Sequence, residues 1–346
     1  MVTLGCLFNR IPQTRRVANV SVSRKTRALP AKAKLAISDY ERAATSRLED
    51  FIRKVEAVSP PPMLFHYTND VGLRGILESG TLWLTDIFNL NDPSELRHGL
   101  RIAIQLLKGR EDPARPEIEL FASQLERFDI DAGVEQAGHF FICCFSGDGD
   151  DLGQWRAYGD DGRGFALGFE AKSLEGGFTI KNGKPIRNNS TFHITYDDAE
   201  LATLETTFTD EIEPLISLPR TLSMTGDQIN SYMRNLLTYH SLHVIRSTMF
   251  FKHEAYRNER EYRFQQLFRR DRAPPAVKLR HRPYSVVRYR EFSWRNEAPG
   301  ALQKIVVGPA ADRAKAKQFA DDCLREFCAG NTVDVEYSTI PYRSPR

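Results

Sequence analysis

The amino-acid sequence predicts an α+β fold with a single mixed or antiparallel β core and flanking helices. Short apolar or aromatic runs of strand length, such as 139–146, are interspersed with long stretches of helical periodicity, such as 199–250. Their order lacks the regular alternation of a βαβ fold, and the sequence contains no internal repeat. With 41% hydrophobic and 27% charged residues, the composition is that of an ordinary globular protein.

The N-terminal segment differs in charge from the rest of the chain. Residues 1–35 contain eight Lys or Arg residues and no Asp or Glu, so a net charge of +3 leaves the remainder acidic. We expect 1–35 to be a disordered basic arm that could contact nucleic acid or act as a transit peptide. Residues 36–62 are expected to form an N-terminal helix, over 36–57, and a linker at "SPPP"; the main domain then covers 63–343.

The main domain divides into expected strands and helices. The corner at 91–93, "NDP", is interpreted first as a structural boundary between a strand and a helix, with Asp92 as the helix cap, and second as a site element. The helical block after residue 199 is expected to break near 217–228, where Pro and Gly occur. Strands are expected at 63–68, 81–86, 139–146, 162–170, 191–198, 259–268, 303–309 and 332–338. Helices are expected at 69–79, from 92 onwards, at 117–128 and at 311–328, with a short helix or turn at 152–159.

Several function classes are excluded by missing patterns. No run approaches the roughly 18 apolar residues of a membrane helix. The five cysteines form no C-x-x-C pair or disulfide framework, so we expect free thiols in a reducing cytoplasm and no metal site. Phosphate-binding fingerprints, the hydrolase G-x-S-x-G and the metalloprotease H-E-x-x-H are also missing.

The segment "FKHEAYRNEREYRF" (251–264) contains the candidate catalytic carboxylates. If 259–268 is a strand, Glu259 and Glu261 share one face with Arg263. Two like charges at that separation need cations or a substrate nearby. A solvated strand edge with surface ion pairs is the simpler interpretation of the same residues.

Two other stretches carry candidate ligand contacts. His66 lies at the end of an expected strand and could donate or accept a hydrogen bond, although most single histidines have no special role. Trp155 and Tyr158 are three residues apart on one side of a helical turn and could stack on a planar cationic ring, or pack on the core as a lid.

Four segments together resemble a known family. They are "FHYTNDVGLRGILESGTLWLTDIFNLNDPSE", "FICCFSGDGDDLGQWRAYGDDGRGFALGFE", "FKHEAYRNEREYRF" and "KIVVGP" with "STIPYR". Their order and spacing over about 63–343 resemble the bacterial family called domain of unknown function 2971. The family name records no activity. The layout of an early His, a central aromatic and a late Glu is also similar to ADP-ribosyltransferases of the His-Tyr-Glu type, including DNA-targeting toxins.

That second resemblance implies an ADP-ribosyltransferase-like fold, NAD as the substrate and an enzyme with a toxin or defence role. Its acceptor stays open: protein, nucleic acid, small molecule or water. Two alternatives stay open as well, a non-catalytic ligand-binding or sensor domain and a nucleic-acid-associated module. The catalytic residues implied are Glu261, Glu259 and His66, and the NAD-binding residues are His66, Tyr67, Thr68, Trp155, Tyr158, Arg156 and Arg263.

Overall fold

The computed structural model describes residues 29–89, 95–269, 274–282, 284–330 and 332–344. Most of the expected basic arm and the corner at 91–93 lie outside these residues. The end of the expected arm is helical, because helix α2 (Ala31–Glu56) begins after Pro30 rather than at residue 36. Its buried side chains recur at helical spacing, from Ala33 to Val55, as an amphipathic helix requires.

The structure confirms a mixed α+β fold with a mostly antiparallel sheet and flanking helices. The main sheet has ten strands, and among its described pairs only β11 with β12 is parallel. A separate two-stranded ribbon joins β5 (Ile180–Lys181) to β6 (Lys184–Pro185). The main-sheet strands are β1 (Met63–Thr68), β2 (Leu82–Asp86), β3 (His139–Ser146), β4 (Phe165–Glu170), β7 (Asn189–His193), β8 (Glu261–Phe268), β9 (Lys278–Arg282), β10 (Ser285–Phe292), β11 (Leu302–Val307) and β12 (Asp334–Tyr337).

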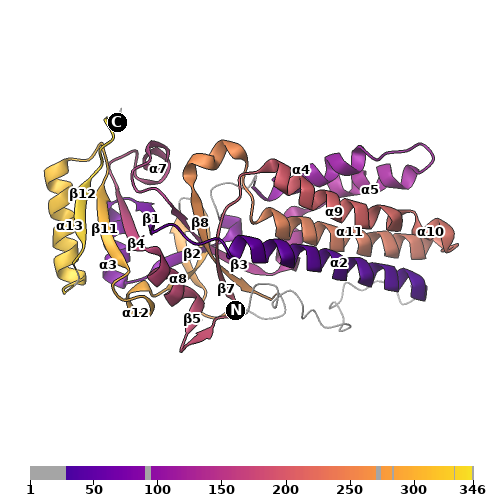
Figure 1. Cartoon of the computed structure of the whole chain (residues 1–346), viewed down its shortest axis with the longest axis horizontal. Helices are drawn as coiled ribbons and strands as arrows, with labels where there is room; N and C mark the ends of the chain where they lie inside the picture. Colours follow the sequence, from indigo (N-terminus) through magenta and orange to yellow (C-terminus); the bar gives the residue numbers. More distant parts are fainter. Residues whose placement is uncertain (1–28, 90–94, 270–273, 283, 331, 345–346) are drawn as a thin grey trace.

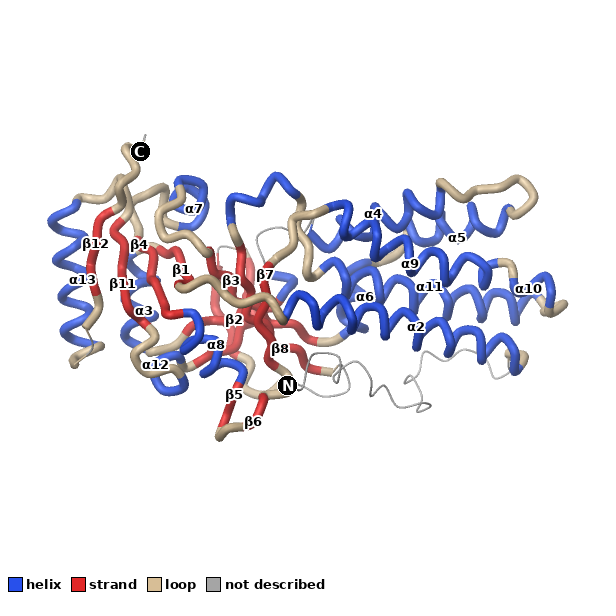
Figure 2. The backbone as a smooth tube through the Cα atoms, viewed as in Figure 1, coloured by secondary structure: helices blue, strands red, loops and turns tan. Residues whose placement is uncertain are grey.

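Two groups of helices cover the sheet (Figures 1 and 2). One group forms an elongated layer beside β3, β7 and β8, and the other packs near β4 and β11 at the opposite end. The first group contains α2, α4 (Glu95–Lys108), α5 (Pro116–Glu126), α6 (Ile130–Ala137), α9 (Asp198–Ile216), α10 (Leu218–Thr221) and α11 (Gly226–Thr248). The second contains α3 (Asp70–Ser79), α8 (Ala171–Thr179), α12 (Trp294–Glu297) and α13 (Arg313–Phe327).

The sequence patterns identified most elements and missed several. The expected break near 217–228 is confirmed, because α10 and a turn separate α9 from α11. The capping box at Thr225 and Gln228 starts α11 and satisfies two backbone donors. The helices α6, α8 and α12 and the strands β5, β6, β9 and β10 were not expected.

Strand β3 divides the apolar core between the two faces of the sheet. Phe140 and Ile142 pack with the long helices, whereas Phe141, Cys143 and Phe145 pack with the second group of helices. This alternation follows from the two-residue period of a strand. Because both faces of β3 are covered by helices, nearly all of its side chains are apolar.

Candidate functional site

A cavity lies where the sheet divides. Strand β3 pairs with β2 at Phe141 and Ile142, and with β1 only at Ser146. Between these points β1 and β2 separate from β3, and a cavity of about 730 Å³ opens. That volume falls within the range of about 300–1,000 Å³ that is usual for small-molecule sites. Side chains from β1, β2, β3, β8, β9, α3 and α7 line it.

Glu261 begins β8 and reaches this cavity from one side of β3. It is only 5% exposed, and its carboxylate accepts hydrogen bonds from Arg263 Nε at 2.5 Å and Lys252 Nζ at 3.3 Å. Burial alone would raise the pKa of Glu261, but the charges of Arg263 and Lys252 and their hydrogen bonds lower it to about 2. The carboxylate is therefore ionised at neutral pH, and both of its oxygens contact cations.

Glu259 reaches the same cluster by another route than expected. It ends the 3-10 helix η2 (Glu254–Glu259) and is not part of β8, so the expectation that Glu259 and Glu261 share a strand face is wrong. Arg260 between them has φ +45° and ψ +47°, the left-handed conformation, and it ends the 3-10 helix before β8 begins. Lys252 Nζ donates to Glu259 Oε2 at 2.5 Å, so one ammonium bridges the two carboxylates.

His66 in β1 reaches the cavity from the other side of β3. Its Nδ1 donates to the carbonyl oxygen of Cys144 at 3.1 Å, across the gap where the strands have separated. Burial lowers the pKa of His66, so the ring is neutral. A neutral ring with a proton on Nδ1 has its Nε2 as an acceptor. Strand β3 thus places His66 and Glu261 at one cavity: Cys144 accepts from the first through its carbonyl oxygen, and its thiol hydrogen-bonds the second.

The neighbours of His66 also line the cavity. Thr68 lies at the end of β1 beside Gly72 of α3. Tyr67 donates its hydroxyl proton to the carbonyl oxygen of Asp148 at 2.8 Å and accepts from the backbone N–H of Asp151 at 3.1 Å. Its hydroxyl is thereby committed to holding the loop before helix α7 (Leu152–Tyr158).

The two expected aromatic residues separate in the structure. Trp155 is fully buried, donates to Asp150 Oδ1 at 2.8 Å and packs edge-on against Tyr67, so it belongs to the core and does not line the cavity. Tyr158 lines the cavity and is 37% exposed. The expectation that both lie on one side of the helical turn is therefore wrong, since the turn points one ring inward and the other toward the ligand space.

The two expected arginines also differ. Arg263 lines the cavity, but its guanidinium is buried, binds Glu261 and donates to the carbonyl oxygen of Met249 at 3.3 Å. Arg156 is exposed on α7 and does not line the cavity. Neither gives the cavity a guanidinium that is free for a phosphate group.

Four charged or aromatic residues that line the cavity received no role in the sequence interpretation. Lys252 was part of a quoted motif but received no role, although it bridges the two glutamates. Trp83, Arg280 and Arg282 come from β2 and β9 and line the opposite wall. Alternating basic residues in "KLRHR" (278–282) are the one sequence signal that could have indicated a cationic face on a strand.

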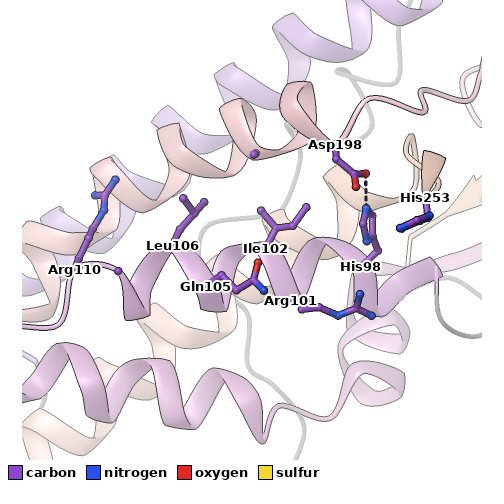
Figure 3. Close-up of a pocket in the computed structure, with 10 residues that line it drawn as sticks. His98, Arg101, Ile102, Gln105, Leu106, Arg110, Asp198 and His253 are labelled. Carbon is purple, nitrogen blue, oxygen red and sulfur yellow. Dashed lines mark hydrogen bonds and ion pairs between the residues drawn. The ribbon is translucent and has the colours of Figure 1, made fainter. Parts of the chain in front are cut away.

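A second hollow, of about 660 Å³, lies between α4 and α9 (Figure 3). His98 Nε2 donates to Asp198 Oδ1 at 2.8 Å, and the ring of His253 lies 5.6 Å from that of His98. His253 accepts from the backbone N–H of Ala255 and so caps η2. None of the residues expected from the sequence lines this hollow.

Metal and membrane features were searched for in the described part of the chain. No three His, Cys, Asp or Glu side chains there are grouped so that they could hold a metal ion. None of the helices in that part combines the length and the apolar character needed to cross a bilayer.

Comparison with known proteins gives one match. The model of a family described as protein of unknown function (DUF2971) matches residues 154–264. The matched segment supports the resemblance to that family and includes Tyr158, Glu259, Glu261 and Arg263. Neither the curated proteins nor the solved structures gave a match. The comparisons give no support for the resemblance to ADP-ribosyltransferases.

Proposed function

We propose that the protein cleaves the nicotinamide–ribose bond of NAD, as an ADP-ribosyltransferase or an NAD glycohydrolase. One observation carries the proposal: His66 on β1 and Glu261 on β8 line a single cavity from opposite sides of β3. A neutral acceptor and an ionised carboxylate are then available at one dinucleotide-sized space. The residue types and their order also match the resemblance described for the sequence.

The proposed reaction begins with rupture of the glycosidic bond between ribose C1′ and the nicotinamide nitrogen. The bonding electron pair leaves with nicotinamide, and positive charge develops on the ribosyl group. Glu261, which remains ionised, stabilises that charge and accepts from a ribose hydroxyl. A lone pair of the acceptor then forms the new bond to C1′, and the acceptor's proton passes to Glu259 as general base. With water as the acceptor, the products are nicotinamide and ADP-ribose.

The remaining cavity residues would bind and orient the substrate. His66 Nε2 would accept a hydrogen bond from a hydroxyl of the adenosine-side ribose, and the Tyr158 ring would cover the cationic nicotinamide ring. Lys252 would keep both Glu259 and Glu261 ionised, because its ammonium group donates a hydrogen bond to each carboxylate. Loss of the ammonium would make the two carboxylates compete for one proton.

A second candidate is a non-catalytic ligand-binding domain, and one observation favours it. Both oxygens of Glu261 already accept from Arg263 and Lys252, as in a buried structural ion cluster. A ligand could then bind the cavity without any reaction at that carboxylate. The nucleic-acid-associated alternative depends on the basic arm, most of which lies outside the described residues.

The decisive experiment measures nicotinamide release from NAD by the wild-type protein and by Glu261→Gln, with water alone and with candidate acceptors. We expect the substitution to reduce the rate about 100-fold or more, the loss typical for removal of a preorganised electrostatic group. The matched control is Glu254→Gln, because Glu254 is exposed on η2 and outside the cavity. This control should keep the wild-type rate.

Because Glu261 lies in a buried ion cluster, each variant also needs a melting measurement with and without NAD. His66→Ala gives a second test that does not disturb the cluster, and it should weaken NAD binding while the variant still melts cooperatively. Ligand-dependent stabilisation of the wild type without nicotinamide release in any mixture would instead favour the binding domain. An unchanged rate in folded Glu261→Gln would refute the catalytic role.

A further inference from the structure

The wall of the cavity opposite Glu261 carries two arginines and a tryptophan on one face of the sheet. Trp83 of β2 is paired with Glu291 of β10, Arg280 with Val287, and Arg282 with Ser285. Residues that face each other across antiparallel strands point to the same side, and 285, 287 and 291 alternate along β10. All three side chains therefore project from the same face, and all three line the cavity.

The two guanidinium groups lack the counter-charges that other basic residues here possess. Within the described residues, no carboxylate lies within ion-pair distance of Arg280 or Arg282. Lys278, on the same strand and the same face, binds Glu291 at 2.6 Å. The contrast shows that the neighbouring strand β10 provides a carboxylate for one cation of β9, whereas among the described residues none pairs with the two arginines inside the cavity.

Arg280 is held in place but incompletely hydrogen-bonded. Its guanidinium lies 5.0 Å from the centre of the Trp83 ring, and Tyr289 packs against that ring at 4.5 Å. Its Nε is buried and has no hydrogen-bond partner among the described residues. A buried donor without an acceptor is costly unless a ligand satisfies it. Burial, and to a smaller extent the charge of the adjacent Arg282, lower the pKa of Arg280, while Tyr289 acts in the opposite direction.

We propose that Arg280 and Arg282 bind the pyrophosphate group of a nucleotide. This inference rests on the proposed function and deepens it by giving the orientation of the substrate in the cavity. The ribosyl bond would lie at Glu261 and the phosphates at β9. Two positions two residues apart in a strand are separated by about 6.6 Å, a spacing that lets each guanidinium meet one phosphate. The acidic pair at the other end, Glu259 and Glu261, disfavours a continuous nucleic-acid backbone.

The proposal also explains a deficiency of the site as predicted from the sequence. The guanidinium of Arg263 is occupied by Glu261, and Arg156 does not line the cavity. A dinucleotide in this cavity therefore needs another cationic partner, and β9 supplies it. Arginine suits this role because its planar fork makes two parallel hydrogen bonds to phosphate oxygens.

The test is calorimetric titration of the full chain with inorganic pyrophosphate, ADP and adenosine. We expect pyrophosphate and ADP to bind and adenosine to bind at least about tenfold more weakly than ADP, because it lacks the charged group. The variants R280Q and R282Q should each weaken ADP binding about 10-fold to 100-fold, the range for one charge-assisted contact. The matched control is K278Q, a basic residue of the same strand outside the cavity, which should bind ADP as the wild type does.

Two results would overturn the proposal. One is an equal ADP affinity in R280Q, R282Q and the wild type, with all three melting alike. The other is tight binding of a single-stranded oligonucleotide together with no binding of pyrophosphate, which would indicate a nucleic-acid surface. R280K should give an intermediate affinity, since it keeps the charge and loses the fork.

The titration needs no turnover, so its outcome is separate from that of the NAD assay. Arginine-dependent ADP binding without nicotinamide release would support the phosphate site and refute the transferase function. Nicotinamide release that depends on Glu261 but not on Arg280 or Arg282 would do the reverse.

Discussion

Two buried glutamates show how differently the helical layer and the sheet treat the same side chain. Glu205 of α9 is fully buried, its Oε1 accepts from Ser247 at 2.5 Å, and its Oε2 has no partner among the described residues. Burial raises its pKa to about 8, whereas two cations hold the pKa of the equally buried Glu261 at about 2. Burial therefore acts to raise the pKa of both glutamates, and the neighbouring charges decide whether each carboxylate is ionised at neutral pH.

The comparison matters for function because an electrostatic role needs an ionised group. At neutral pH Glu205 carries a proton and is buried in α9, while Glu261 keeps its charge beside the cavity. The helical layer therefore offers a structural acid, and the sheet offers a charged group that a developing cation could contact.

The largest expected effect comes from removing the cation that distinguishes Glu261. Arg263→Met removes one of the two cations that bind the buried carboxylate of Glu261 and leaves Lys252 as the other. We therefore expect the free energy of unfolding at pH 7 to fall by about 3 kcal/mol. Urea unfolding measures this change. Arg156→Met, at an exposed position of α7, is the control and should stay within about 0.5 kcal/mol. Adding Glu261→Gln to Arg263→Met should recover part of the loss; a double variant less stable than the single one would contradict the explanation.

The next effect is a pH dependence of opposite sign at the two glutamates. The folded pKa of Glu205, about 8, exceeds that of an unfolded glutamate, about 4.3, so the unfolded state loses its proton first as the pH rises. Stability should therefore fall from about pH 4.5 to about pH 8, by up to about 1.4 kcal/mol per pH unit. For Glu261 the folded pKa is depressed, so its contribution is present above about pH 4.5 and lost as the pH falls toward 2.

Urea unfolding of Glu205→Gln at pH 5, 6.5 and 8 isolates the first of these dependences. The variant should lose the downward slope and gain most over the wild type at pH 8. Glu200→Gln, at an exposed position of the same helix, should keep the wild-type slope. Parallel curves for the wild type and Glu205→Gln would show that Glu205 is not the titrating group.

A smaller effect is expected at another buried polar contact of the helical layer. Tyr40 and His240 Nδ1 form a hydrogen bond of 2.8 Å between α2 and α11, and His240 Nε2 has no partner among the described residues. Tyr40→Phe removes the hydrogen bond at Nδ1 of His240, so both ring nitrogens would lack a partner among the described residues. The free energy of unfolding should therefore fall by about 1 to 2 kcal/mol. Tyr239→Phe is the control, since its hydroxyl makes no hydrogen bond within the described residues. Equal losses in thermal melts of both variants would argue that the hydrogen bond contributes nothing specific.

The smallest effect concerns the left-handed turn that brings Glu259 to Lys252. Arg260 has φ +45°, a backbone conformation that is sterically unfavourable for residues with a side chain and that glycine adopts at no steric cost. Arg260→Gly should therefore be about 1 kcal/mol more stable than Arg260→Ala, since both lose the exposed ion pair with Asp148 and only alanine keeps the strain. Chemical denaturation of the two variants measures the difference, and a more stable alanine variant would contradict the assigned turn.

The sequence by itself determined the α+β class, most strands and helices, and the segment that holds Glu261 and Arg263. These features depend on local periodicity, caps and breaks, which short stretches of sequence contain. Strand alternation was enough to put Glu261 and Arg263 on one face, and the structure keeps them there.

Only the tertiary structure decided which residues meet. The strand pattern wrongly extended β8 back to Glu259, because a left-handed Arg260 leaves no mark on hydrophobic periodicity. Helical spacing could not say that Trp155 would turn into the core and Tyr158 toward the cavity. Lys252, Trp83, Arg280 and Arg282 join the site through strand pairing between distant segments, and sequence patterns do not encode such non-local contacts. The pKa of Glu261 is likewise a tertiary property, since it depends on where Arg263 and Lys252 place their charges.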